Sequence, residues 1–262
     1  MRTTKSRIIP LNNDLNKLQA FIPSLNKDWR DNQRIKSKEY QIETLDAIEG
    51  FQKEGWKIDG AYEQRGRDKR ISSHMIKMQH PDFNIKNAKN QTEAIATLNI
   101  SNSCNGSKPL EMDLGALRQV CSNGLISHTK YSSEKATHTQ KGYYSLPQIM
   151  GKLNSRISDV MNEFNKLKTV KLSPSEAMDL AIAAVESRFG KGSGIEASQL
   201  LNVVRSEDEG NDLWSVYNRI QENVTQSDRI YNPEGKLITG IDNPFVDTKV
   251  NKELFQLAYA YA

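Results

Sequence analysis

The order of secondary-structure signals predicts an α+β fold, in which an antiparallel sheet in the N-terminal half is packed by a helical C-terminal half. Between residues 56 and 144, segments rich in β-branched and aromatic residues are separated by turns. After residue 145, apolar residues recur every three or four positions, as in amphipathic helices. Because the strands come before the helices instead of alternating with them, α+β is favoured over a parallel βαβ arrangement.

Three parts are expected along the chain, and together they form one continuous domain. Residues 1–37 are predicted to be an extended N-terminal arm, because Asn, Lys, Arg and Asp dominate there. Residues 38–144 are predicted to hold one helix and the antiparallel strands, and residues 145–262 the remaining helices. The helix lies within 37–55, where Gly55 ends an apolar pattern of helical spacing formed by Ile42, Leu45, Ile48 and Phe51.

The strand signals start with a hairpin. Residues 56–64 and 70–80 flank a turn-rich segment, and residues 93–101 supply a third strand. Residues 124–133 and 135–144 are predicted to be strands that pair with each other.

Four helices are predicted after residue 145, over 146–168, 173–190, 211–224 and 251–262. The second has Ser173 as N-cap with Pro174 and Glu176 completing the signal, and Asn211 is the predicted cap of the third. The third helix is expected to pack against the sheet through Leu213, Val216, Tyr217 and Ile220.

Two clusters of Ser, Cys, Asn and Gly, Ser-Cys-Asn-Gly at Cys104 and Cys-Ser-Asn-Gly at Cys121, lie 17 residues apart. We predict that both are structural turns, since Asn-Gly pairs form tight turns, and that both cysteines are free thiols. A metal would have to be held by some of Cys104, Cys121, His74, His80, His128 and His138. The close ligand pairs that are typical of zinc sites are absent from the sequence, so we expect no metal.

Catalytic motifs are also missing. The segment 190–194 lacks the spacing of a P-loop and follows a helix, so a helix-ending glycine explains it. The sequence has no GxSxG elbow. A magnesium-dependent nuclease motif fails because Glu93 is not followed by the required lysine. The sequence therefore favours a protein that is not an enzyme and uses no cofactor.

The charges are unevenly distributed. Residues 1–142 carry 23 Lys and Arg against 16 Asp and Glu, whereas residues 143–262 carry 13 against 16. A basic half favours contact with a polyanion, although an unevenly charged solvated surface gives the same totals. The cations concentrate at the turn of the first hairpin and on its returning strand, at Arg65, Arg67, Lys69, Arg70 and Lys77.

This basic hairpin is predicted to contact nucleic-acid backbone, because phosphate contacts need charge and donors more than base-specific geometry. Lys130 and Lys135 are expected to assist. Tyr62 and Tyr131 offer stacking faces for unpaired bases, so single strands are favoured. A solvated turn whose charges only maintain solubility is the alternative interpretation.

Arg118 is a fixed cation in an apolar run. It is expected to pair with a carboxylate such as Asp113 or Glu111, or else to face a ligand phosphate.

Residues 98–126 resemble the central block of a family of phage- and plasmid-borne proteins of unknown function, described as phage/plasmid-like proteins. The family shows an Asn-Ser-x-x-Gly-Ser step and then an Arg-x-Val-Cys-x-Asn-Gly-Leu step. Here these are Asn102, Ser103, Gly106, Ser107, Arg118, Val120, Cys121, Asn123, Gly124 and Leu125. Residues 211–224 are similar to the family's late helix. The chain departs from the pattern at residues 104–105, where relatives often have His-Asp and this chain has Cys-Asn.

The resemblance implies a place among phage replication and recombination genes. The order of strands and helices is also similar to single-strand annealing proteins, an analogy at the level of fold. We therefore expect a phage-type protein that binds single-stranded DNA, or anneals it, in recombination or replication, and that forms a homo-oligomer. The alternative is an interaction protein that counters or regulates host machinery without binding nucleic acid.

The expected location is the bacterial host cytoplasm. The sequence has no apolar run long enough to span a membrane, and its first residues lack the apolar core of a secretory signal.

Overall fold

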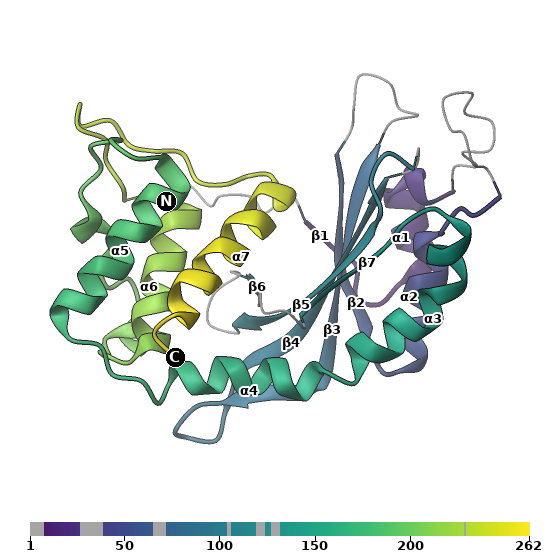
Figure 1. The fold of residues 1–262 in the computed structure, drawn as a ribbon, viewed down its shortest axis with the longest axis horizontal. Helices are drawn as coiled ribbons and strands as arrows, with labels where there is room; N and C mark the ends of the chain where they lie inside the picture. The colour runs from purple at the N-terminus through teal and green to yellow at the C-terminus, as the bar shows by residue number, and fades with distance from the viewer. Residues whose placement is uncertain are drawn as a thin grey trace.

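The structure is a computed structural model that describes residues 8–26, 39–64, 72–103, 106–118, 124–126, 132–227 and 229–262. A long twisted sheet crosses the middle of the molecule. The helices of the N-terminal half and α3 cover one side of it, and a C-terminal helical lobe lies on the other (Figure 1). The α+β class is therefore as predicted.

The sheet is an antiparallel meander. Its strands are β1 (Ile9–Pro10), β2 (Lys57–Gln64), β3 (Ser73–Lys86), β4 (Thr92–Ser103), β5 (Leu110–Arg118), β6 (Gly124–Ile126) and β7 (Ser133–Ala136). Their order is β1-β2-β3-β4-β5-β6, and β7 pairs with β5 as well. The predicted hairpin and third strand are confirmed as β2, β3 and β4.

The sheet differs from the prediction around β5. The sequence showed no strand there, because β5 is buried on both faces and lacks the alternation that marks a half-exposed strand. The expected pairing of 124–133 with 135–144 is wrong, since β6 and β7 both pair with β5 and residues from Gln140 onward are helical.

Side chains alternate across the sheet, so cross-strand partners share a face. Lys77, Asn99 and Asp113 are opposite one another on β3, β4 and β5 and form a polar row. The neighbouring rows are apolar and point to the other face, for example Ile76, Ile100 and Met112.

The helices are α1 (Leu15–Phe21), α2 (Thr44–Lys53), α3 (Gln140–Asn154), α4 (Ile157–Leu167), α5 (Pro174–Phe189), α6 (Leu213–Gln226) and α7 (Pro244–Tyr259). Short 3-10 turns are η1 (Pro23–Asn26), η3 (Ala197–Leu201) and η4 (Ser206–Asp208). Within the described ranges, every helix is too short or too polar to cross a membrane.

Helix α5 is as predicted, including the capping box between Ser173 and Glu176. Other boundaries differ. The single helix expected over 146–168 is two helices, α3 and α4, because the apolar spacing continues across the break between them. The cap of α6 is Asp212 and not Asn211, since the Asp212 side chain accepts the backbone N–H of Ser215. The N-terminal segment expected to be extended contains β1 and α1.

The expected packing of α6 on the sheet needs correction. Its residues Leu213, Val216, Tyr217 and Ile220 are buried as predicted, but its main neighbours are η3, α7, α5, η4 and α4. Helix α4 packs on β3 and β5, and α7 on β6, so these two helices join the lobe to the sheet. Helical periodicity identifies the buried face of a helix but not the element that buries it.

Candidate nucleic-acid interface

One end of the sheet carries the predicted basic turn. We call it the hairpin end, marked by Gln64, Ser73, Ser103 and Leu110. Gln64 pairs with Ser73, and Ser73 pairs with Ser103. Strand β2 therefore ends and β3 begins at this end, and segment 65–71 connects them in sequence. The predicted contact residues Arg65, Arg67, Lys69, Arg70 and Lys130 lie outside the described residues.

A buried histidine organises the hairpin end. The His74 ring lies 2.9 Å from Ser24 Oγ through Nδ1 and 2.7 Å from Thr44 Oγ1 through Nε2. Asn102 Nδ2 also donates to Thr44 Oγ1, at 3.1 Å. Burial lowers the pKa of His74 to about 4, so the ring is neutral near pH 7. This neutral ring fastens η1 and the start of α2 to β3.

A second histidine fastens the start of α3. His138 Nδ1 accepts the backbone N–H of Ile42 at 3.2 Å, and Nε2 lies 3.0 Å from the carbonyl oxygen of Lys108. Burial lowers the pKa of His138, and its bond to that carbonyl opposes the shift. The segments before α2 and α3 are thus held against the β4–β5 connection at the hairpin end.

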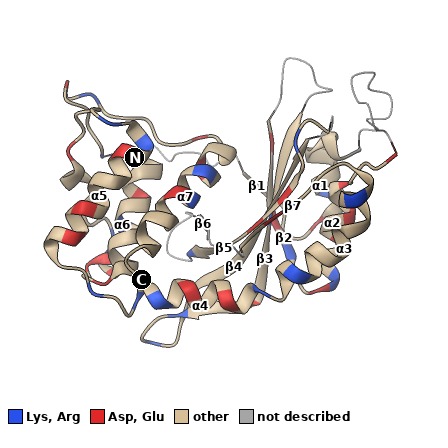
Figure 2. Cartoon of the chain, viewed as in Figure 1, with Lys and Arg blue, Asp and Glu red and all other residues tan. Residues whose placement is uncertain are grey.

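Two strongly basic segments attach at this end. Segment 65–71 joins β2 to β3, and segment 27–38 runs from η1, held by the His74 contact, to the residues just before α2. Together these segments contain nine Lys and Arg against three Asp and Glu. Elsewhere, cations and acids are interspersed along the described helices (Figure 2). The excess positive charge of the N-terminal half is therefore concentrated in segments attached here.

The described contact candidates are less available. Lys77 is only 8% exposed and faces Asp247 of α7, whose carboxyl group it affects electrostatically. Lys135 is 59% exposed, and its Nζ lies 2.6 Å from Glu111 Oε1. Both lysines thus have a carboxylate near them, and only Lys135 presents most of its side chain to solvent.

Arg118 is buried and paired with a carboxylate, as the first of its two expected roles required, but its partner is not Asp113 or Glu111. Its guanidinium lies 2.9 Å from Asp208 Oδ1 and 3.8 Å from Glu93 Oε1. Asp113 instead pairs with Lys252 of α7, at 2.5 Å. The Arg118 pair joins β5 to the helical lobe.

The aromatic residues also differ from the prediction. Tyr62 is 8% exposed and packs edge-on against Phe245, so it offers no open ring face, and Tyr131 lies outside the described residues. Exposed rings near the hairpin end include Tyr143 and Tyr144, which were assigned to a strand from the sequence. Two adjacent tyrosines in a polar, lysine-containing segment were the available signal.

The described part of the first Ser-Cys-Asn-Gly cluster is a turn, as predicted. Gly106 has φ +64°, which favours glycine, and Ser103 Oγ accepts the backbone N–H of Lys108 at 2.9 Å. Cys104, Asn105, Cys121 and Asn123 lie outside the described residues.

The described histidines are used structurally. His74 and His138 engage both ring nitrogens, and His80 Nε2 lies 2.9 Å from the carbonyl oxygen of Glu54. In the described part of the chain, no three His, Cys, Asp or Glu side chains gather as a metal site would require.

Asp247 lies at the polar row, and burial raises its pKa from the usual 3.8 to about 6, with Lys77 opposing the shift. A raised carboxyl pKa means that the folded state binds the proton more tightly. This contribution to stability is present below pH 3.8 and is lost as the pH rises through 6.

We therefore expect Asp247→Asn to stabilise the protein by on the order of 1 kcal/mol at pH 7.5. This value is smaller than the full pKa shift of Asp247 would give, because the side chain is partly exposed and solvent screens its charge. At pH 4 the gain should vanish. Urea unfolding at both pH values measures this difference. Asp242→Asn, at an exposed site just before α7, is the control and should give no pH-dependent gain. An equal effect of Asp247→Asn at both pH values would contradict the assignment.

Comparisons with known proteins give a family but no activity. A family model described as "Domain of unknown function (DUF932)" matches residues 34–252. The chain is 27% identical over 262 residues to UPF0380 protein YafZ of Escherichia coli (strain K12), covering 93% of this chain and 89% of that protein. It is 28% identical over 255 residues to UPF0380 protein YfjQ of the same organism, covering 92% and 88%. No solved structure matches the chain.

Proposed function

This chain belongs to the DUF932 family, whose function is unknown, and we propose that it binds nucleic acid at the hairpin end of its sheet, with single-stranded DNA favoured. The observation that carries the proposal is the attachment of two basic segments, 27–38 and 65–71, at one end of the sheet. Their nine cations against three acids make a local excess that suits a polyanion.

The rigid part of this site is built from the two histidine contacts. They fix residues that flank segment 27–38, and the starts of α2 and α3, relative to β3 and β4. Cations attached to a fixed frame can follow a phosphate backbone without ordering the whole domain on binding. The exposed tyrosines at the start of α3 supply ring faces, which only unpaired bases can use.

The more specific proposal is a phage-type protein that binds or anneals single strands in recombination or replication and acts as a homo-oligomer. Its support is the resemblance of residues 98–126 to phage/plasmid-like proteins and the succession of a long antiparallel meander and helices. The second argument is an analogy of fold.

The first experiment is a gel shift of the purified protein with single- and double-stranded oligonucleotides at 50 and 200 mM salt. Four phosphate contacts to a single strand imply a slope of about −3 in log affinity against log salt, so this fourfold rise in salt should weaken binding roughly 50-fold. Failure to shift any oligonucleotide at 50 mM salt would reject the proposal. It would favour the alternative, an interaction protein that does not bind nucleic acid.

Changing Arg65, Arg67, Lys69 and Arg70 together to Ala should reduce the salt slope by about 3 and weaken binding similarly for unrelated sequences, since phosphate contacts do not read bases. Fluorescence anisotropy across a salt series measures both. A matched control removes the same charge at exposed lysines far from the hairpin end, namely Lys89, Lys166, Lys191 and Lys236. Equal losses in the two variants would show that net charge, and not this turn, determines binding.

A further inference from the structure

We propose that Tyr143 and Tyr144, with the pocket between α2 and α3, receive an unpaired base of the bound strand. This inference rests on the proposed function and extends it from the phosphate backbone to the bases. It assigns a base-binding role to residues that no comparison assigns.

The two tyrosines project from the first turn of α3. Thr139 caps the helix by accepting the backbone N–H of Gly142, and the tyrosines follow directly. Tyr143 is 40% exposed and Tyr144 70%. Their ring centroids are 5.5 Å apart, and those of Tyr40 and Tyr144 are 6.2 Å apart in an edge-on arrangement. Three rings therefore meet at the surface, and the most exposed one has room for a stacking partner.

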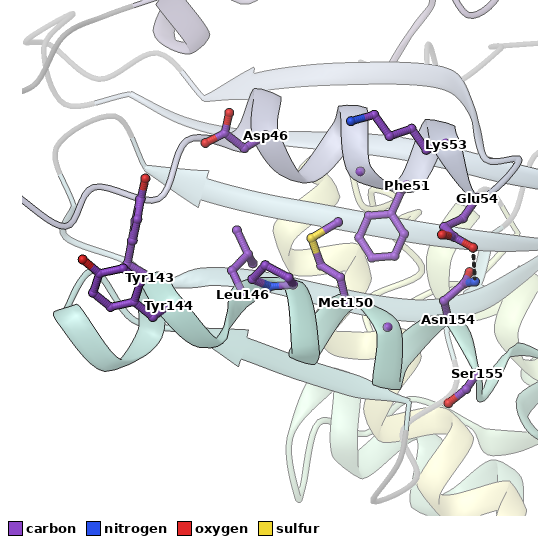
Figure 3. Close-up of a pocket in the computed structure, with 13 residues that line it drawn as sticks. Asp46, Phe51, Lys53, Glu54, Tyr143, Tyr144, Leu146, Met150, Asn154 and Ser155 are labelled. Atoms are coloured by element: carbon purple, nitrogen blue, oxygen red, sulfur yellow. Dashed lines mark hydrogen bonds between the residues drawn. The ribbon is translucent and has the colours of Figure 1, made fainter.

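The pocket beside them has a volume of about 670 Å³. Figure 3 shows the tyrosines at one end, the apolar side chains of Phe51, Leu146 and Met150 along its length, and Glu54 at the other end. Asn154 Nδ2 donates to Glu54 Oε2 at 3.3 Å. The tyrosine end combines exposed rings with the apolar side chains of Leu146 and Met150, which suits the apolar faces of a nucleobase. The polar groups at the other end are paired with each other.

The charges of the pocket favour the base over the phosphate. Asp46 and Glu54 line the pocket together with one lysine, Lys53, so a phosphate that enters the pocket would meet an acidic rim. The starts of both helices are fastened through Ile42 and His138 to the hairpin end, where the basic segments attach. A strand that binds at the hairpin end is therefore close to the tyrosine end of the pocket, where one of its bases can turn inward.

Two substitutions test the site without touching the core. Tyr144→Ala removes the most exposed ring. Gly151→Leu fills the pocket from α3, where an added Cβ has no neighbour within 4 Å, so the helix tolerates the side chain. Tyr231→Ala, at a 50% exposed tyrosine in the helical lobe, is the control. Melting curves check that all three variants remain folded.

The probe is a single-stranded oligonucleotide containing 2-aminopurine, whose fluorescence is quenched when the base stacks on a ring. We expect quenching with the wild-type protein and with Tyr231→Ala. With Tyr144→Ala and Gly151→Leu, quenching should be lost and affinity should fall about tenfold, while affinity for a duplex should not change because its bases are already stacked.

The outcomes separate the two proposals. If the wild-type protein binds the probe and all variants bind and quench equally, the base site is wrong and backbone binding stands. If the wild-type protein binds no oligonucleotide at 50 mM salt, the proposed function falls, and the base site falls with it.

Discussion

Replacing Arg118 with Ala is expected to lower the free energy of unfolding by about 4 kcal/mol, the range observed when one partner of a buried ion pair is removed. Arg118 and Asp208 are both 1% exposed, and two guanidinium nitrogens reach the two carboxylate oxygens at 2.9 and 3.1 Å. Without the arginine, Asp208 keeps the desolvation that already raises its pKa and loses the charge that opposes it.

The position of the pair increases its effect. Glu93 lies 3.8 Å from the Arg118 guanidinium, accepts the indole N–H of Trp214, and pairs with Lys168. These side chains belong to β4, β5 and α6 and to the residue that caps the end of α4, so the cluster joins the sheet to the helical lobe. Removing its central cation therefore breaks one ion pair and also weakens the junction between the sheet and the helical lobe.

Urea unfolding of Arg118→Ala measures the loss, and Lys135→Ala is the control. Lys135 is 59% exposed, and such surface pairs contribute less than about 1 kcal/mol. An Arg118→Ala protein with unchanged stability and reduced affinity for single-stranded DNA would reverse the interpretation and make this arginine a ligand contact.

Much of the fold follows from local patterns, and the errors have a common cause. The capping box at Ser173 and the hairpin of β2 and β3 depend on neighbours in the sequence, and both were predicted correctly. Strand β5 was missed because both its faces are buried. The packing of α6 was wrong because periodicity does not name the covering element. These features depend on partners far away in the chain.

The candidate site shows the same limit. The apolar residues around Arg118 predicted that it either pairs with a carboxylate or faces a ligand phosphate. Its partner Asp208 is 90 positions away and could not be identified from the sequence. Lys77 was read as a surface cation, yet the register of β3 places it in a polar row facing α7. The cations of segment 65–71 lie outside the described residues, so their role remains a prediction that the hairpin variant tests.

Replacing Tyr217 with Ala is expected to destabilise the protein by about 4 kcal/mol, as other deletions of large buried aromatic side chains do. Tyr217 is 1% exposed on α6, and its ring packs edge-on against Phe255 of α7 with centroids 6.2 Å apart. Phe255 in turn contacts Phe164 of α4, at 5.0 Å. The ring therefore supports the contact of α6 with α7 and, through Phe255, with α4.

Tyr217→Phe separates the ring from its hydroxyl. Burial raises the pKa of Tyr217, and the hydroxyl has no hydrogen-bond partner among the described residues. Removing a buried, unpaired hydroxyl should leave stability unchanged or raise it by about 1 kcal/mol, because that group no longer has to be desolvated. Thermal unfolding of the two variants tests both expectations together. A melting temperature unchanged in Tyr217→Ala would show that α6 does not use this face to hold the lobe together, and a large loss in Tyr217→Phe would show that the hydroxyl has a partner essential to the fold.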